Sequence, residues 1–154
     1  MNCTIRLAEP RDAAAVGGLV DDLLQELAGL AADMERRARF VSLAEDLLQS
    51  GAYWAFLAEA PEGEAPIGVL TLNRCLAIYA GGAFGEICEL YVAPERRSRT
   101  VAAQLVDAAF EFARAQGWSR LEVGAPDQPA WSATLRFYQR IGFQEVGPRL
   151  KRLA

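Results

Sequence analysis

The chain has 154 residues, of which 52% are hydrophobic, and this excludes a disordered polymer and predicts one domain, residues 1–154, with a sizeable core. It contains no histidine, so Ser-His-Asp triads, Cys-His pairs and imidazole metal sites are excluded. A formal charge of −4 argues against broad binding to nucleic acid.

The three cysteines, Cys3, Cys75 and Cys88, have no CxxC spacing, which argues against a disulfide framework and against a cysteine zinc site. No apolar run reaches the roughly 18 residues of a membrane span, and the N-terminus carries no secretory signal. We therefore expect a cytoplasmic protein with no metal and no membrane partner. Any general base must be a carboxylate, the lone lysine, a tyrosine, a cysteine or a water held by these groups.

The first third of the chain predicts one strand and two helices. Residues 4–8 alternate apolar and polar side chains, which is typical of a strand. Pro10 and Asp12 then open a helix. Its apolar stripe consists of Val16, Val20, Leu23 and Leu27. A second helix is predicted over residues 35–49, and residues 29–34 form the corner between the two.

Three strands are predicted next, over residues 53–59, 67–78 and 86–92, and short turns at residues 61–66 and 81–82 favour an antiparallel meander. A helix follows with Val101, Leu105, Ala108 and Phe112 on one face, and Gly117 lies just past its end. Residues 120–123 then predict a short strand parallel to 86–92, because such crossovers are right-handed. A helix over 130–141 and a last strand over 143–146 complete the chain.

Arg96, Arg97 and Arg99 lie in the loop before the third long helix. A helix N-terminus carries roughly +0.5 charge, so cations there are unfavourable by about 0.3–1 kcal/mol each. Their placement makes sense if the site normally holds an anion. The alternative is a solvated loop. We expect the backbone N–H groups of the first turn and the arginine side chains to converge on phosphate.

The strand ELYV, Pro94, this basic loop and the following helix resemble motif A of the GNAT superfamily of N-acetyltransferases, which bind acetyl-coenzyme A. Against the pattern Gln/Arg-x-x-Gly-x-Gly/Ala, Arg97 and Ala102 match, and Thr100 replaces the middle glycine. A second segment, Trp131 to Phe143, resembles the family's Asn-x-x-Ala-x-x-Phe-Tyr-x-x-x-Gly-Phe, with its Phe-Tyr and Gly-Phe pairs intact.

The resemblance implies an α/β fold of the GNAT type: a mixed, mostly antiparallel twisted sheet with helices on both faces, in the order β-α-α-β-β-β-α-β-α-β. It implies acetyl-CoA as co-substrate and acetyl transfer to a primary amine of a small molecule or peptide, by direct attack in a ternary complex. The alternative is a catalytically silent CoA-binding or regulatory module of the same fold. The acceptor and a homodimer stay open.

By the same resemblance, Glu86 is the expected base, and Glu89 is the reserve candidate in case the strand bulges. Regular alternation would place Glu86, Cys88 and Leu90 on one face. Tyr138 matches the tyrosine that protonates the departing thiolate. The alternative interpretations are a solvated charge at a strand end for Glu86 and core packing for Tyr138.

The main chain of Leu90 is expected to polarise the thioester carbonyl, and that of Tyr91 and Val92 to bind the pantetheine arm. Met34 and Trp131 are candidate acceptor or ligand contacts, with core packing as the alternative. The pyrophosphate is expected on the backbone of Arg97, Ser98, Arg99, Thr100, Val101, Ala102 and Ala103.

Overall fold

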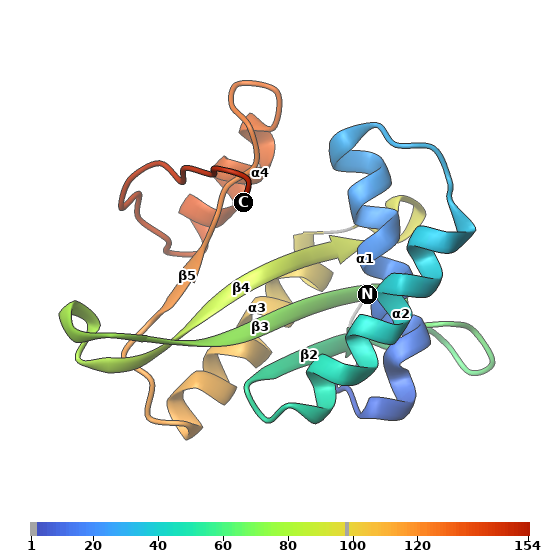
Figure 1. Cartoon of the computed structure of the whole chain (residues 1–154), viewed down its shortest axis with the longest axis horizontal. Coiled ribbons are helices and arrows are strands. Elements are labelled where there is room, and N and C mark those ends of the chain that lie inside the picture. Colours follow the sequence, from blue (N-terminus) through green and yellow to red (C-terminus); the bar gives the residue numbers. More distant parts are fainter. Residues whose placement is uncertain (1–2, 98) are drawn as a thin grey trace.

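The computed structural model describes residues 3–97 and 99–154, and it is a mixed sheet layered between helices (Figure 1). The long elements in chain order are β1 (Ile5–Leu7), α1 (Ala13–Ala28), α2 (Met34–Gln49), β2 (Tyr53–Ala58), β3 (Gly68–Ala77), β4 (Gly82–Val92), α3 (Arg99–Ala115), β5 (Leu121–Val123) and α4 (Ser132–Arg140). Single 3₁₀ turns lie at Pro10–Asp12, Ile78–Ala80 and Pro94–Arg96. None of the described helices is long and apolar enough to span a membrane.

The strands lie in the order β1-β2-β3-β4-β5. All neighbours are antiparallel except β4 and β5, which are parallel. The predicted meander and the predicted parallel crossover are therefore confirmed. The predicted fold class, a mixed and mostly antiparallel sheet with helices on both faces, is confirmed as well.

Each face of the sheet buries its own apolar cluster, as the two-residue period of the strands requires. Leu57 and Val69 pack with Val16 of α1, on the face that α1 and α2 cover. Leu70 and Leu72 pack with residues of α3, on the opposite face. We call the first of these the α1/α2 face, and the candidate site lies on it.

The sheet is interrupted by a β-bulge in β4. Thr71 of β3 pairs with Glu89, but the next residue, Leu72, pairs with Ile87, so Cys88 is the extra residue. Ile87 packs in the α3 cluster whereas Tyr91 packs in the α1/α2 cluster, which shows that the bulge reverses the alternation. The prediction that Leu90 shares a face with Glu86 is wrong for this reason, because Leu90 packs against the α3 cluster and Glu89 takes its place.

The sheet also opens between β4 and β5. The two strands pair only from Gly85 to Ile87 on β4, and β4 then continues to Val92 without a partner on that side in the described sheet. Figure 1 shows β5 turning away from β4 toward α4. The result is a V-shaped gap in the ladder, which we call the splay.

The predicted last strand, residues 143–146, is not formed, and residues 143–154 contain no helix or strand. Phe143 packs against Phe110 of α3 and Tyr138 of α4, with ring centroids 5.9 and 5.5 Å away. This anchor holds the segment against the helices, and Gly147, at φ 126°, turns the chain soon afterwards. The three residues of β5 also give a sixth strand little to pair with.

Candidate active site

The splay exposes the backbone of β4 on the side where β5 has left. Ala93 N–H donates to the Ile67 carbonyl oxygen at 2.8 Å, so the backbone groups of residue 93 point toward β3. Because these groups alternate along an antiparallel strand, those of Leu90 and Val92 point into the splay and those of Tyr91 toward β3. Leu90 is thus positioned as a donor to a ligand in the splay. The side chain of Tyr91 is buried beneath α1.

Glu89 lies on the α1/α2 face and is held by two hydroxyl groups from neighbouring strands. The Tyr53 hydroxyl donates to its Oε2 at 3.1 Å, and the Thr71 hydroxyl donates to the same oxygen. Burial raises the pKa of Glu89, although the hydrogen bonds from Thr71 and Tyr53 partly offset this effect. Glu89 is therefore fixed in orientation and biased toward its protonated form.

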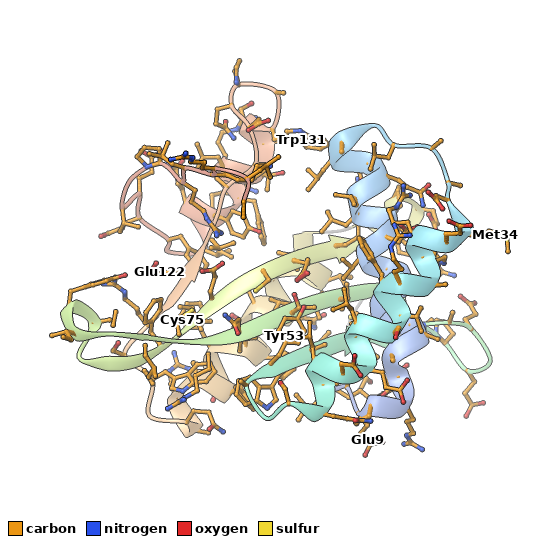
Figure 2. All side chains as sticks on the ribbon, in the orientation of Figure 1. Glu9, Met34, Tyr53, Cys75, Glu122 and Trp131 are labelled. Carbon is orange, nitrogen blue, oxygen red and sulfur yellow. The ribbon has the colours of Figure 1, made fainter. Side chains whose placement is uncertain are left out.

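Glu86 lies on the same face, three residues earlier in β4, where it pairs with Asn73 of β3 and Glu122 of β5. Its Oε1 accepts a hydrogen bond from Nη1 of Arg149 at 3.1 Å. The side chain of Glu86 is 27% exposed. Figure 2 shows Tyr53, Cys75 and Glu122 along this part of the sheet, so the face carries carboxylates and hydroxyls together.

Cys88, the bulge residue, lies between the two glutamates in sequence. Although Cys88 is exposed by its accessible surface, partial desolvation by the surrounding protein, and then the charges of Glu89 and Glu86, raise the pKa of its thiol to about 12. A thiol with this pKa stays protonated at neutral pH and is a poor nucleophile. The site therefore contains no activated cysteine at this position.

Tyr138 of α4 is only 6% exposed and packs against Phe137 and Phe143. Burial raises the pKa of its phenol to about 12. No hydrogen bond joins its hydroxyl to another residue within 3–97 or 99–154. The hydroxyl is thus protonated and retains its capacity to donate to a ligand.

Two arginines of the loop before α3 form ion pairs with carboxylates from elsewhere in the fold. Arg96 pairs with Glu64, with Nη2 2.6 Å from Oε2, and Arg97 pairs with Glu26, with Nη1 2.7 Å from Oε1. The structure thus gives both side chains a carboxylate partner, and their convergence on an anion at the helix start stays a prediction. Each has a carboxylate within reach from another part of the fold, and an ion pair satisfies the charge that the helix dipole disfavours.

Arg97 links three parts of the molecule. Its Nε donates to the Val92 carbonyl at 2.9 Å, and its guanidinium lies 5.6 Å from the centre of the Tyr91 ring. Its pair with Glu26 of α1 raises the pKa of Arg97 and lowers that of Glu26. The backbone N–H of Arg97 donates to the Pro94 carbonyl at 3.3 Å. Arg97 thus fastens α1 to the end of β4, and its main chain is engaged in the loop.

The first turn of α3 remains the place where a helix directs backbone N–H groups toward an anion. Val101 is turned into the core at 3% exposure, and Ala102 and Ala103 are half-buried with small side chains. Ser98 and the side chain of Arg99 lie outside the described residues. Thr100 is exposed at the start of the helix, where the family has glycine.

The two candidate ligand contacts outside the sheet differ in placement. Met34, the first residue of α2, is 89% exposed and points away from the body of the molecule (Figure 2). Trp131, just before α4, is half-buried, and Figure 2 shows it on the α4 side of the molecule. Of the two, Trp131 is the less exposed.

Three residues of the site were missed by sequence reasoning: Tyr53, Thr71 and Arg149. Tyr53 and Thr71 reach Glu89 only because the strands pair in the observed register. Arg149 is separated from Glu86 by 63 positions and lies in a segment predicted only in part. Tyr53 and Thr71 could have been found by aligning the three strands of the predicted meander, because this alignment shows which side chains lie near Glu89. For Arg149 we find no local signal.

A twisted sheet that opens beside the start of a helix, with polar side chains on one face, is an arrangement suited to an extended ligand carrying a phosphate group. Residues 20–143 match the model of the acetyltransferase (GNAT) family, and the chain belongs to this family. No curated protein matches the chain in sequence.

Several solved structures share the fold. The ribosomal-protein-alanine N-acetyltransferase of Brucella melitensis biovar Abortus 2308 is 22% identical, with a TM-score of 0.76 over 99% of this chain and 100% of that one. A Clostridium acetobutylicum protein with acetyl-CoA bound is 16% identical, with a TM-score of 0.79 over 99% and 96%. AAC(6')-Iy, in complex with the bisubstrate analog CoA-S-monomethyl-acetylneamine, is 19% identical, with a TM-score of 0.75 over 100% and 99%.

Proposed function

We propose that the protein is an acetyl-CoA-dependent N-acetyltransferase that acetylates a primary amine by direct attack within a ternary complex. The observation that carries the proposal is the open segment of β4, where the backbone of Leu90 points into the splay and Glu86 and Glu89 lie on the adjoining face. Membership of the acetyltransferase family supports acetyl-CoA as the co-substrate.

In this mechanism the pantetheine arm lies along the unpaired edge of β4 like an added strand. The Leu90 N–H donates to the thioester oxygen and stabilises the negative charge that develops there. The Val92 N–H is the second candidate donor to the arm, since its carbonyl already accepts from Arg97. The pyrophosphate lies at the first turn of α3, where the helix dipole favours an anion.

The amine nitrogen attacks the carbonyl carbon of the thioester, the carbon–sulfur bond breaks, and one proton must leave the nitrogen. Glu86 is the proposed base, acting through a water, because its carboxylate is 27% exposed and can exchange a proton with solvent. Glu89 is the alternative, since it is oriented by Tyr53 and Thr71. The gain from such a base is typically about 10²–10⁴-fold in rate.

Tyr138 assists the leaving thiolate. An ordinary thiol has a pKa of roughly 8.5. The Tyr138 phenol, with a pKa of about 12, is the weaker acid and therefore does not transfer its proton fully to the leaving thiolate. It can instead donate a hydrogen bond to the developing charge, and the proton that the sulfur finally takes comes from solvent. The expected role of Tyr138 is thus stabilisation of the leaving group.

The test is a thiol-release assay with acetyl-CoA and a panel of amines, run on the wild type and on Glu86→Gln and Glu89→Gln. We expect Glu86→Gln to lower kcat by about 100-fold or more while changing the Kd for acetyl-CoA by less than about twofold, because the base acts on the amine only. A larger loss of kcat in Glu89→Gln would transfer the role of base to Glu89.

The alternative is a CoA-binding module without catalysis. Thr100 in place of the family glycine, and the ion pairs of Arg96 and Arg97, favour it. Binding of acetyl-CoA in calorimetry without thiol release for any amine of the panel would support this alternative and contradict the transferase proposal.

A further inference from the structure

Arg149, in the segment that follows α4, places its guanidinium in the candidate site. Arg149 reaches Glu86 with Nη1 3.1 Å from Oε1, and its side chain is 68% exposed. Its positive charge also acts on Cys88 and Cys75, where it opposes the rise of the thiol pKa caused mainly by burial. The guanidinium therefore lies on the same face as the residues assigned to the reaction.

Gly124 provides the space for this side chain. A Cβ on Gly124, directly after β5, would lie 2.8 Å from Cδ and 2.9 Å from Nη1 of Arg149. The stem of Arg149 thus crosses the chain where β5 leaves β4, and even a methyl group at Gly124 would displace it. The ion pair between Arg149 and Glu86 therefore requires that residue 124 have no side chain.

While this pair is formed, Glu86 cannot act as a base on the acceptor. A guanidinium does not release its proton in proteins, and a carboxylate held by it is blocked from the ammonium of an acceptor. An exposed pair of this kind is weak, so an incoming cation can replace it. A neutral or anionic acceptor that displaced Arg149 would leave Glu86 without a counter-charge, whereas Glu122 has its own ion pair with Arg120.

We propose that Arg149 occupies the place of the acceptor's cationic group on Glu86, so that cationic acceptors bind in competition with the C-terminal segment. This inference rests on the proposed function for the identity of the site. It assigns the acceptor to the class of cationic amines, and it makes Arg149 a specificity-determining residue.

The experiment is calorimetric titration of spermidine into the wild type, Arg149→Ala, Gly124→Ala and the control Arg152→Ala, which removes an exposed arginine of the same segment. Gly124→Ala displaces the side chain of Arg149 from Cδ outward and is therefore a second way to clear Glu86. We expect Arg149→Ala and Gly124→Ala to bind spermidine about threefold more tightly and Arg152→Ala to bind as the wild type does.

Weaker or unchanged binding in Arg149→Ala, or no spermidine binding in any variant, would overturn the inference. Weaker binding in particular would mean that Arg149 contacts the acceptor. Thiol release is measured on the same four proteins. If Arg149→Ala and Gly124→Ala bind spermidine more tightly than the wild type but no protein releases thiol, the role of Arg149 is supported and the transferase proposal is contradicted. If thiol is released but all four proteins bind spermidine equally, the transferase proposal is supported and the role of Arg149 is contradicted.

Discussion

Glu89 is the residue whose surroundings differ most from those of an ordinary surface glutamate. Two hydroxyl donors, from Tyr53 and Thr71, orient it, and burial raises its pKa. The folded chain therefore holds this proton more tightly than the unfolded chain, in which the group titrates near 4.5. The stabilisation that results is complete below pH 4.5 and is lost as the pH rises through the folded-state pKa.

Glu89→Gln removes this titration while keeping an oxygen that accepts from both hydroxyls. We expect the free energy of unfolding of the wild type to fall, relative to that of Glu89→Gln, as the pH rises from 4.5 to 8. Urea unfolding of both proteins across this range measures the difference. Glu45→Gln on the exposed side of α2 is the control. A difference that grows toward low pH would contradict the assigned sign.

At the scale of elements, the contact between α1 and α2 fixes the two helices that cover the α1/α2 face of the sheet, on which the candidate site lies. A Cβ on Gly17 would lie 2.6 Å from the backbone nitrogen of Val41, so the two helices approach as closely as backbone allows. Beside this contact Asp21 is 1% exposed and accepts from Nε of Arg36 at 2.6 Å. The helix pair is therefore held by close backbone packing and by a buried ion pair.

Gly17→Ala should lower the free energy of unfolding by about 1–3 kcal/mol, because the added methyl group meets backbone that cannot move alone. Gly18→Ala is the matched control, since its methyl group would meet only the guanidinium of Arg37, which can swing away. Both changes gain helix propensity, so Gly18→Ala should be neutral or stabilising. Equal losses in urea unfolding of the two variants would refute the close contact.

At the scale of the whole molecule, a ligand in the splay would bridge β4, β5 and the start of α3. Such a ligand binds the folded state alone and stabilises it, by about 2.7 kcal/mol at a concentration of 100 Kd. For a domain of this size, 1 kcal/mol shifts Tm by about 2–4 °C.

We therefore expect acetyl-CoA at about 100 Kd to raise Tm by roughly 5–10 °C in differential scanning calorimetry. Adenosine, which lacks both the pyrophosphate and the pantetheine arm, is the control and should shift Tm by less than about 2 °C. No shift with acetyl-CoA at any concentration would contradict the assignment of the splay as the cofactor site.

The sequence alone determined the order and type of most elements, because apolar periodicity and turn residues act locally. It also determined that a base must be something other than histidine, and the motif residues around Arg97 and Tyr138 indicated the family. The strand predicted over 143–146 is not formed, because Phe143 packs against aromatic residues of α3 and α4, and this contact is not encoded in the local pattern.

Only the tertiary structure decided which charged side chains form ion pairs or lie on the same face of the sheet. The bulge at Cys88 brings Glu89 onto the face of Glu86, Arg97 pairs with Glu26 across 71 positions, and Arg149 reaches Glu86 across 63. Strand register and the packing of distant segments set these distances, and a local pattern of residues does not contain either of them.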